Sequence, residues 1–498
     1  MHSLGLIYNL IVKKYFLLSL YILITTMIAF HHELWRDEVD VWLMARDVSS
    51  PKDFFAYLSN SGHPGLWHLI LLPFAKLNFP AFTMQIVHLS IAIASVYLFL
   101  SYSPFPDYIK LLFVFSYFPL FEYSIISRNY GVGVLFLFAT ASFYTKRFEK
   151  PILYGSLVLF LCNTNLYCSI LASGISFIYF LEIIQERKFE KNILIGFMIM
   201  VLGGLLLILQ VLPNPETGEH KSIFANMKNF LAIPVSLLYS FSTGVSKFNF
   251  LILPSVFILP VAFRVFYKTK KPFFFLIWVM AILFLFYTFF YMRSYRHAGF
   301  VLFAFLFAYW IYYTYSERII SNSLILDIRK KEFYQSENIL QVLFIFSLLI
   351  SIQFSFQTAK KDFLYSFSNA KEMAEFIKKE KLDDIENKIA THSADSGKTV
   401  LFYLDSIHSF YFPASDRFGS FNPWDKKAWK GEEMEGEKAY AITMEKFKNV
   451  ENVYYLASSA LPEFTKGATL LYKTKNRNEF IKEEEFYLYK LDTATKEK

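Results

Sequence analysis

The sequence has 498 residues, of which 55% are hydrophobic, 20% aromatic and 18% charged, and its formal net charge is +8. A soluble chain of this length carries less apolar content and more charge, so the composition excludes an ordinary soluble enzyme. Much of the Lys and Arg lies in short connectors between apolar runs, where basic residues orient a membrane protein. The positive charge therefore does not indicate nucleic acid, and we expect no such partner.

Apolar runs close to membrane-spanning length recur between Tyr15 and Phe356. Because roughly 20 helical residues cross a hydrocarbon core about 30 Å thick, these runs predict a polytopic α-helical membrane domain at residues 1–356, with about 11–13 hydrophobic helices. After residue 356 the composition is that of soluble sequence, which predicts a second domain at 357–498. The candidate spans are 15–31, 65–79, 81–101, 109–126, 130–145, 151–164, 166–184, 193–212, 230–246, 249–266, 273–292, 299–315 and 338–356.

The first apolar run follows Lys13-Lys14, as in a secretory signal sequence. The residues after Ala29 offer no small-x-small cleavage site, so we expect an uncleaved first span with its N-terminus in the cytoplasm. The two cysteines, Cys162 and Cys168, lie in an apolar segment and do not indicate the redox compartment.

Four basic connectors mark the cytoplasmic side of the predicted membrane domain. The four connectors fall on one side only if the segments 109–126 and 230–246 enter the membrane from the outside and return there without crossing it. Such half-spanning backbone is tolerated where it lines a protein cavity. The outer face would then hold the C-terminal domain and five segments of the membrane domain. The basic connectors are 146–150, 186–188, 264–271 and 329–331, and the outer segments are 32–64, 122–130, 163–167, 213–229 and 293–297.

The residue pattern of the outward loop 32–64 predicts two short helices that lie in the membrane interface. In the first, apolar residues from Val39 to Met44 interleave with charged ones. In the second, Ser50 is the N-cap and Pro51 occupies the first turn. Pro64 can begin the next span, because its missing N–H costs nothing there.

The sequence of the C-terminal domain predicts an α/β or α+β fold. Asn369 to Glu372 resembles a capping box at the start of a helix. Four apolar, β-branched or aromatic runs predict strands. They are 399–404, 452–456, 469–472 and 485–491. The domain has no glycine-rich phosphate loop and no pattern of metal ligands.

Asp37 and Glu38 lie just after the first span, at the boundary between membrane and water. A carboxylate there can act as general base on an acceptor group or can hold a divalent cation. Alternatively, Asp37 is simply the N-cap of the helix that follows. The sequence alone leaves both interpretations open.

Arg128 and Glu122 lie within or beside an apolar run, where charged groups are costly and usually face a partner or a cavity. Arg128 could bind a phosphate, because its planar fork matches phosphate oxygens. The alternative is a structural ion pair between Arg128 and Glu122.

Arg293 to His297 concentrates positive charge on the predicted outer face, against the usual bias. A lipid-linked phosphate or pyrophosphate would explain it, and headgroup snorkelling is the alternative. His220 and Lys221 are weaker candidates for the same site. His63 stands at a span entrance, where a cap or a headgroup contact is the simpler interpretation.

Asn163 and Asn165 break an apolar stretch, and for them we favour hydrogen bonds to another helix.

These segments, in this order, resemble the GT-C membrane glycosyltransferases, and most closely the protein-mannosyltransferase and aminoarabinose-transferase branch. The resemblance covers roughly residues 1–315. It departs from the family where Gly65 follows Pro64 in place of a second proline, and at 163–165, which lacks the usual histidines and so leaves a metal role there in doubt. The motifs are Arg36-Asp37-Glu38, Gly62-His63-Pro64, Ser127-Arg128-Asn129-Tyr130, Asn163-Thr164-Asn165 and Arg293 to Gly299.

The resemblance implies inverting transfer of a sugar from a polyprenyl-phosphate donor to an acceptor glycan, lipid or protein on the outer face of the membrane. Asp37 would be the base, supported by Glu38, or would hold a divalent cation; no cofactor is otherwise implied. The protein would be a multi-pass bacterial inner-membrane protein of the cell envelope, in contact with membrane lipid. The implied substrate or phosphate contacts are His63, Glu122, Arg128, Tyr130, Arg293, Arg296 and His297.

Two other functions remain open from the sequence. A transporter or flippase for a lipid-linked substrate would also need buried Arg and Glu, although the sequence lacks the internal repeat common in transporters. A non-catalytic envelope assembly protein would use its outer domain to bind a partner.

Overall fold

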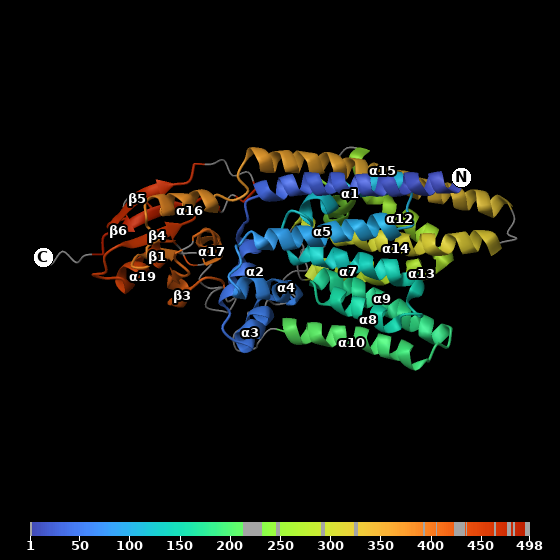
Figure 1. Ribbon diagram of the computed structural model, residues 1–498, viewed down its shortest axis with the longest axis horizontal. Coiled ribbons are helices and arrows are strands. Elements are labelled where there is room, and N and C mark those ends of the chain that lie inside the picture. Colours follow the sequence, from blue (N-terminus) through green and yellow to red (C-terminus); the bar gives the residue numbers. More distant parts are fainter. Residues whose placement is uncertain are drawn as a thin grey trace.

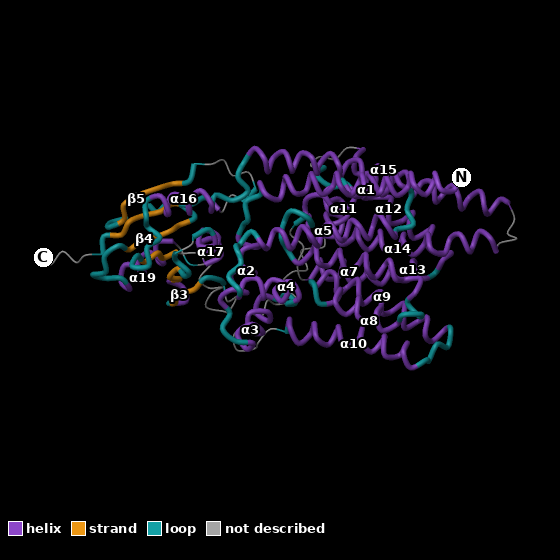
Figure 2. The backbone as a smooth tube through the Cα atoms, viewed as in Figure 1, coloured by secondary structure: helices purple, strands orange, loops and turns teal. Residues whose placement is uncertain are grey.

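The computed structural model describes most of the chain. The described residues are 2–212, 232–245, 250–289, 294–322, 327–391, 394–404, 406–422, 434, 436–462, 465–475, 480–481 and 484–493. Long helices lie side by side in a bundle, and a domain of strands and short helices lies at one end of it (Figure 1). Figure 2 shows the strands gathered at that end.

Eight helical segments in the described part of the chain are long and apolar enough to cross a membrane, which is the pattern of a membrane-spanning protein. They lie in α1 (His2–His31), α5 (Thr83–Tyr102), α9 (Leu166–Gln185), α10 (Lys191–Val211), α12 (Leu253–Phe266) with the short turns beside it, α13 (Lys271–Phe289), α14 (Tyr295–Asn322) and α15 (Asp327–Leu364). α15 continues past the predicted domain boundary at residue 356 and ends beside the C-terminal domain.

Several predicted spans form shorter helices. They are α4 (Leu66–Lys76), α6 (Asp107–Val114), α7 (Asn129–Phe143), α8 (Pro151–Cys162) and α11 (Ala232–Phe241). α11 lies within the predicted re-entrant segment 230–246, and its ten residues are too few to cross a bilayer.

The prediction that 109–126 returns to the side it entered from is wrong. The segment forms α6, a break, and the π-helix η1 (Phe118–Glu122). Before it, the Phe105 ring contacts Tyr309 at 5.5 Å. After it, the Tyr123 hydroxyl donates to the carbonyl of Arg296 at 2.5 Å. Because Tyr309 and Arg296 lie more than three turns apart on α14, roughly 20 Å, the segment runs along the bundle.

The prediction that 65–79 is a span is also wrong. Its helix α4 begins and ends beside the two helices of the 32–64 loop, α2 (Arg36–Asp47) and α3 (Pro51–Ser61). At its start Gly65 packs against the side chain of Leu58. At its end Lys76 Nζ donates to the carbonyl of Val48 at 2.5 Å. α4 therefore lies at the end of the bundle that carries the C-terminal domain.

Three of the four basic connectors meet at one end of the bundle, as predicted. Arg147 forms two hydrogen bonds of 2.7 Å with the carboxylate of Glu182. Lys271 contacts the same carboxylate at 2.5 Å and Glu186 at 3.2 Å. Which side of the membrane this end faces stays a prediction.

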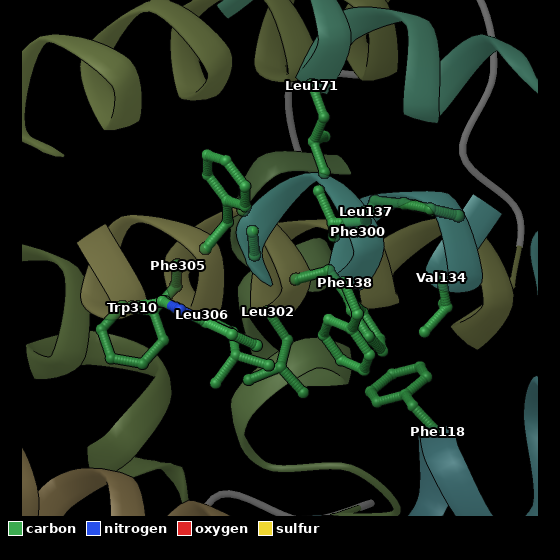
Figure 3. Packing of buried hydrophobic residues seen from close by; sticks show 14 of the residues in the cluster. Phe118, Val134, Leu137, Phe138, Leu171, Phe300, Leu302, Phe305, Leu306 and Trp310 are labelled. Carbon is green, nitrogen blue, oxygen red and sulfur yellow. The ribbon is translucent and has the colours of Figure 1, made fainter. Parts of the chain in front are cut away.

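The core of the bundle is built around α14. From Ala298 to Tyr312 this helix is buried on all sides, as expected of a helix that is apolar all round. Its aromatic side chains pack against α7 and η1, as Phe300, Phe138 and Phe118 illustrate (Figure 3). Gly299 permits a close approach to these neighbours, because a Cβ there would overlap the hydroxyl of Tyr123 and the ring of Phe118.

The C-terminal domain holds a mixed six-stranded sheet of order β3-β2-β1-β4-β6-β5. β1 pairs in parallel with β2 and β4, and the other pairs are antiparallel. Helices α16, α17 and α19 accompany the sheet. The bounds are β1 Lys388–Thr391, β2 Phe410–Phe412, β3 Arg417–Gly419, β4 Val453–Ala457, β5 Ala468–Lys473, β6 Tyr487–Leu491, α16 Ala370–Lys379, α17 Ala394–Phe402 and α19 Gly436–Lys446.

Three predicted strands and the helix after Asn369 are confirmed as β4, β5, β6 and α16. The strand predicted at 399–404 is wrong, because its first four residues complete α17. Val400 and Leu401 are fully buried there, so tertiary packing outweighs the strand preference of this apolar run. β1, β2 and β3 were not predicted.

The two predicted helices of the 32–64 loop are confirmed, and Ser50 caps the second by accepting from the Asp53 N–H at 3.2 Å. The first, α2, differs from the expectation of an interfacial helix. Its residues Glu38 to Ala45 are buried, because α4 covers one side and α17 of the C-terminal domain covers another. The bundle and the C-terminal domain therefore share this helix.

Candidate functional site

Asp37 lies in the first turn of α2, where the chain leaves α1. The N-cap position belongs to Trp35, so the alternative of Asp37 as N-cap does not apply. The Trp35 N–H is instead bonded to the Glu38 carboxylate at 3.3 Å. The Asp37 side chain therefore does not cap the helix, and it points toward the turn before α7.

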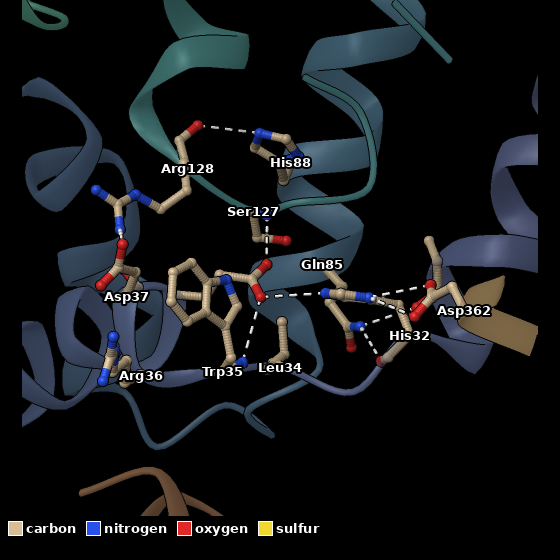
Figure 4. Close-up of polar contacts among 12 residues, drawn as sticks. His32, Leu34, Trp35, Arg36, Asp37, Gln85, His88, Ser127, Arg128 and Asp362 are labelled. Atoms are coloured by element: carbon tan, nitrogen blue, oxygen red, sulfur yellow. Dashed lines mark hydrogen bonds and ion pairs between the residues drawn. The ribbon is translucent and has the colours of Figure 1, made fainter. Parts of the chain in front are cut away.

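Two arginines from different helices share one oxygen of Asp37. Arg128, just before α7, contacts Asp37 Oδ2 at 2.7 Å, and Arg296, in the first turn of α14, contacts it at 3.0 Å. Arg128 also donates to the Asp37 carbonyl at 3.0 Å. Figure 4 shows its guanidinium beside the Asp37 carboxylate. Segments separated by some 90 and 260 positions in the chain are thereby brought together, and all three belong to segments that the sequence analysis placed on one face.

The charges at this cluster set the protonation state of Asp37. Burial opposes its ionisation, but the guanidinium groups of Arg128 and Arg296 outweigh burial and hold the pKa of Asp37 well below its usual range. Among the described contacts, this one carboxylate faces two guanidinium groups. The cluster is therefore suited to an anionic ligand, and it is a poor base while both arginines contact it.

Glu38 holds the neighbouring backbone in place. It is fully buried and accepts from the Ser127 N–H at 2.5 Å in addition to the Trp35 N–H. The turn that carries Arg128 is thus tied directly to the turn that carries Asp37. This geometry fits a supporting role for Glu38.

His32 continues the network toward the end of α15. Its ring nitrogens face Glu38 at 3.1 Å and Asp362 at 3.1 Å (Figure 4). Burial would lower the pKa of His32, but the two carboxylates raise it to about 10. The sequence analysis missed this triad. Its only signal was a histidine pair directly after an apolar span.

His63 lies near the cluster, in the turn before α4. Its Nδ1 is buried without a hydrogen-bond partner among the described residues. Burial, and then the charge of Arg128, lower the pKa of His63 to about 4, which keeps the ring neutral. It is therefore available to contact an uncharged polar group.

The alternative pairing of Arg128 with Glu122 is not formed, because Arg128 pairs with Asp37. Glu122 instead accepts from the Tyr117 hydroxyl at 2.5 Å. The guanidinium of Arg128 lies 5.7 Å from the centre of the Tyr130 ring, a cation–π contact that helps to orient it.

His297 is buried in the bundle beside Arg296. Its ring stacks on Tyr167 at 5.1 Å and meets the edge of Tyr130 at 6.1 Å. It thus packs among aromatic side chains of the bundle. The remaining predicted residues Arg293, His220 and Lys221 lie outside the described residues.

The structure supports the structural interpretation of Asn163 and Asn165. Asn163 donates to the carbonyl of Gly203 on α10 at 3.1 Å, and Asn165 caps α9 by accepting from the Cys168 N–H at 2.9 Å. Neither residue reaches the Asp37 cluster through a described contact.

The donor groups around Asp37 do not fit a divalent cation. No group of three or more His, Cys, Asp or Glu side chains that could hold a metal occurs among the described residues. The Oδ2 atom that a cation would use lies beside two guanidinium groups, which repel positive charge. We therefore assign no step to a metal.

Residues of the C-terminal domain form hydrogen bonds with the backbone of the turn that carries Asp37. Glu484 accepts from the Arg36 N–H at 3.0 Å, and the Tyr403 hydroxyl donates to the carbonyl of Leu34 at 3.2 Å. One turn further along α2, Lys398 Nζ forms an ion pair of 2.8 Å with Asp40, and its side chain is fully buried. These contacts come from beyond residue 356 and were not predicted.

Comparison with known proteins gives no assignment: the chain matches no protein-family model, no curated protein and no solved structure.

Proposed function

We propose that this protein is a membrane glycosyltransferase of the GT-C type, which moves a sugar from a polyprenyl-phosphate donor to an acceptor glycan, lipid or protein. The observation that carries the proposal is the cluster of Asp37 with Arg128 and Arg296, at the end of an apolar helical bundle. A lipid-borne phosphate needs cationic groups at that depth, and a transferred sugar needs a carboxylate beside them.

The two arginines would hold the phosphate of the donor. A guanidinium matches phosphate oxygens in two-point geometry, and fixed positive charge stabilises a phosphate leaving group. When both arginines turn to the phosphate, they release Asp37. The pKa of Asp37 then rises from its depressed value, and the carboxylate becomes a competent base.

The transfer itself is an inverting displacement. The acceptor hydroxyl attacks the anomeric carbon on the face opposite the phosphate, and its proton passes to Asp37. The bond between the anomeric carbon and the phosphate oxygen breaks, and its electron pair leaves with the polyprenyl phosphate. His63, Glu122, Tyr130, Arg293 and His297 are the further residues we assign to binding, while Glu38 holds the backbone.

We further propose an architecture and a location for the protein. The membrane domain would have about 11–13 hydrophobic helices, as the length of the apolar runs predicts. The basic connectors at Arg147 and Lys271 would face the cytoplasm. The Asp37 cluster and the C-terminal domain would then lie outside the bacterial inner membrane, where the cell envelope is built.

The test separates binding from transfer. Asp37→Asn removes the base but leaves both arginines, so we expect sugar transfer in membrane vesicles to fall by a factor of roughly 10² to 10⁴. The same variant should bind a short-chain polyprenyl phosphate at least as tightly as wild type, because a neutral amide replaces the carboxylate that competes for the arginines. Normal transfer by Asp37→Asn would refute the role of Asp37.

The arginines need a matched control. Arg46, at the other end of α2, contacts Asp47 at 2.7 Å, the same distance as Arg128 from Asp37. Arg296→Gln should weaken polyprenyl phosphate binding, whereas Arg46→Gln should not. Movement of labelled lipid between leaflets without any transfer product would favour the transporter instead.

A further inference from the structure

A polar cavity lies where α1 and α15 end, on the side of the bundle where these two helices run together (Figure 1). Its volume is about 330 Å³, at the lower end of the range for ligand pockets. Its lining comes from the end of α1, from the end of α15 and from the first turn of α16. The charged side chains in it are Glu33, Asp362 and Lys371.

Glu33 is the residue of the cavity that indicates a bound ligand. Its Oε2 atom is buried and has no hydrogen-bond partner among the described residues. A buried acceptor without a donor costs free energy, so such an atom in a cavity points to a ligand that donates a hydrogen bond. Burial raises the pKa of Glu33 to about 7, and an ammonium ligand would favour its charged form.

The other two charged groups differ from Glu33. Asp362 is already bonded to His32 at 3.1 Å (Figure 4), so it is not available to a ligand in the same way. Lys371 is exposed on α16, and the structure gives it no ion pair with Glu33. The cavity therefore presents one carboxylate and, separately, one ammonium.

The surroundings place the cavity at the edge of the apolar surface. Phe30 is 62% exposed, Leu364 is 60% exposed and Met27 is 59% exposed, although all three are large apolar residues. They lie in the last turns of the two helices that span the apolar layer. Such a surface is stable against lipid tails, and the polar cavity beyond it lies at headgroup depth.

We infer that this cavity binds the headgroup of a zwitterionic phospholipid with a primary ammonium. The ammonium would donate to the unpartnered oxygen of Glu33, and the phosphate would lie toward Lys371. The acyl chains would lie on the apolar surface formed by Phe30 and Leu364. A quaternary ammonium carries no N–H and cannot satisfy Glu33, so the site selects phosphatidylethanolamine over phosphatidylcholine.

The experiment measures lipid binding and does not depend on sugar transfer. The full-length protein in detergent is titrated with phosphatidylethanolamine or phosphatidylcholine of identical chains, and bound lipid is counted by native mass spectrometry. Wild type should prefer phosphatidylethanolamine by about tenfold or more, as expected for a hydrogen bond between charged groups.

The variants decide the site. Glu33→Gln keeps the size of the side chain and should abolish the preference. The control is Glu375→Gln, which removes a nearby exposed carboxylate on α16 that does not line the cavity. The preference should survive in this control.

Three outcomes would overturn the inference. The first is equal binding of the two lipids to wild type, and the second is an unchanged preference in Glu33→Gln. The third is soluble phosphoethanolamine binding as tightly as the lipid, which would identify a free solute as the ligand. Because sugar transfer is not measured, failure here leaves the proposed transferase untouched, and failure of Asp37→Asn leaves this site untouched.

Discussion

Replacing Lys398 by Met should loosen the C-terminal domain from α2. Lys398 is fully buried and pairs with Asp40 at 2.8 Å, so its loss removes the ammonium group that balances this buried carboxylate. Breaking a buried pair in this way costs roughly 3–5 kcal/mol. Among the described residues, Asp40 keeps the Tyr57 hydroxyl and the Asn422 N–H as donors. We therefore expect the lower end of that range, about 3 kcal/mol, or a factor of ~150 in an equilibrium constant.

Hydrogen exchange of the α2 amides measures this change directly. If these amides exchange when the C-terminal domain separates from α2, their protection should fall by about the factor given above in Lys398→Met. The matched control is Lys446→Met. Lys446 also contacts an aspartate, Asp416, at 2.8 Å, but both side chains are exposed, so protection should not change measurably.

A double variant tests the reason for the effect. Asp40→Asn combined with Lys398→Met removes the uncompensated charge, so it should cost clearly less than the sum of the two single variants. Equal protection in Lys398→Met and Lys446→Met, or a strictly additive double variant, would show that the buried pair does not hold the domain in place.

Two further predictions concern the bundle. The pKa of His32 is raised from about 6.5 to about 10, so its contribution to stability is complete below pH 6.5 and is lost as the pH rises through 10. Thermal unfolding between pH 6 and 11 should show this loss in wild type, and His32→Gln should flatten it; parallel curves would contradict the charged triad. Gly299→Ala should lower the melting temperature at a cost of about 1–3 kcal/mol, because the added methyl overlaps Tyr123 and Phe118. Gly204→Ala, where a Cβ meets nothing within 4 Å, is the control, and an equal loss in both would argue against this contact.

The sequence predicts the membrane body and the position of the site because both depend on local composition. Apolar runs identify helices, and charged groups beside such runs identify a place where burial needs compensation. Asp37, Arg128 and Arg296 were found in this way. Their shared contact follows from the orientation of the helices, which the basic connectors constrain.

The errors have a different origin. The length of an apolar run does not show whether it crosses, so α4 and the broken segment through η1 were misassigned. The run at 399–404 has strand-like residues, but α17 packs against α2, and that contact is not visible in a local pattern. The hydrogen bond from the Arg36 N–H to Glu484 joins residues 448 positions apart, and no spacing rule predicts it.

α14 connects the two polar layers of the molecule. Near its start Arg296 contacts Asp37, and further along Tyr315 accepts a hydrogen bond from Arg147 at 2.9 Å. These two residues are separated by about 28 Å of helix, close to the thickness of a bilayer core of about 30 Å. Because α14 is surrounded by other helices, it cannot tilt to suit a thinner or thicker bilayer. Hydrophobic mismatch must therefore be absorbed by the outer helices, such as α10, and the spacing between the layers stays constant.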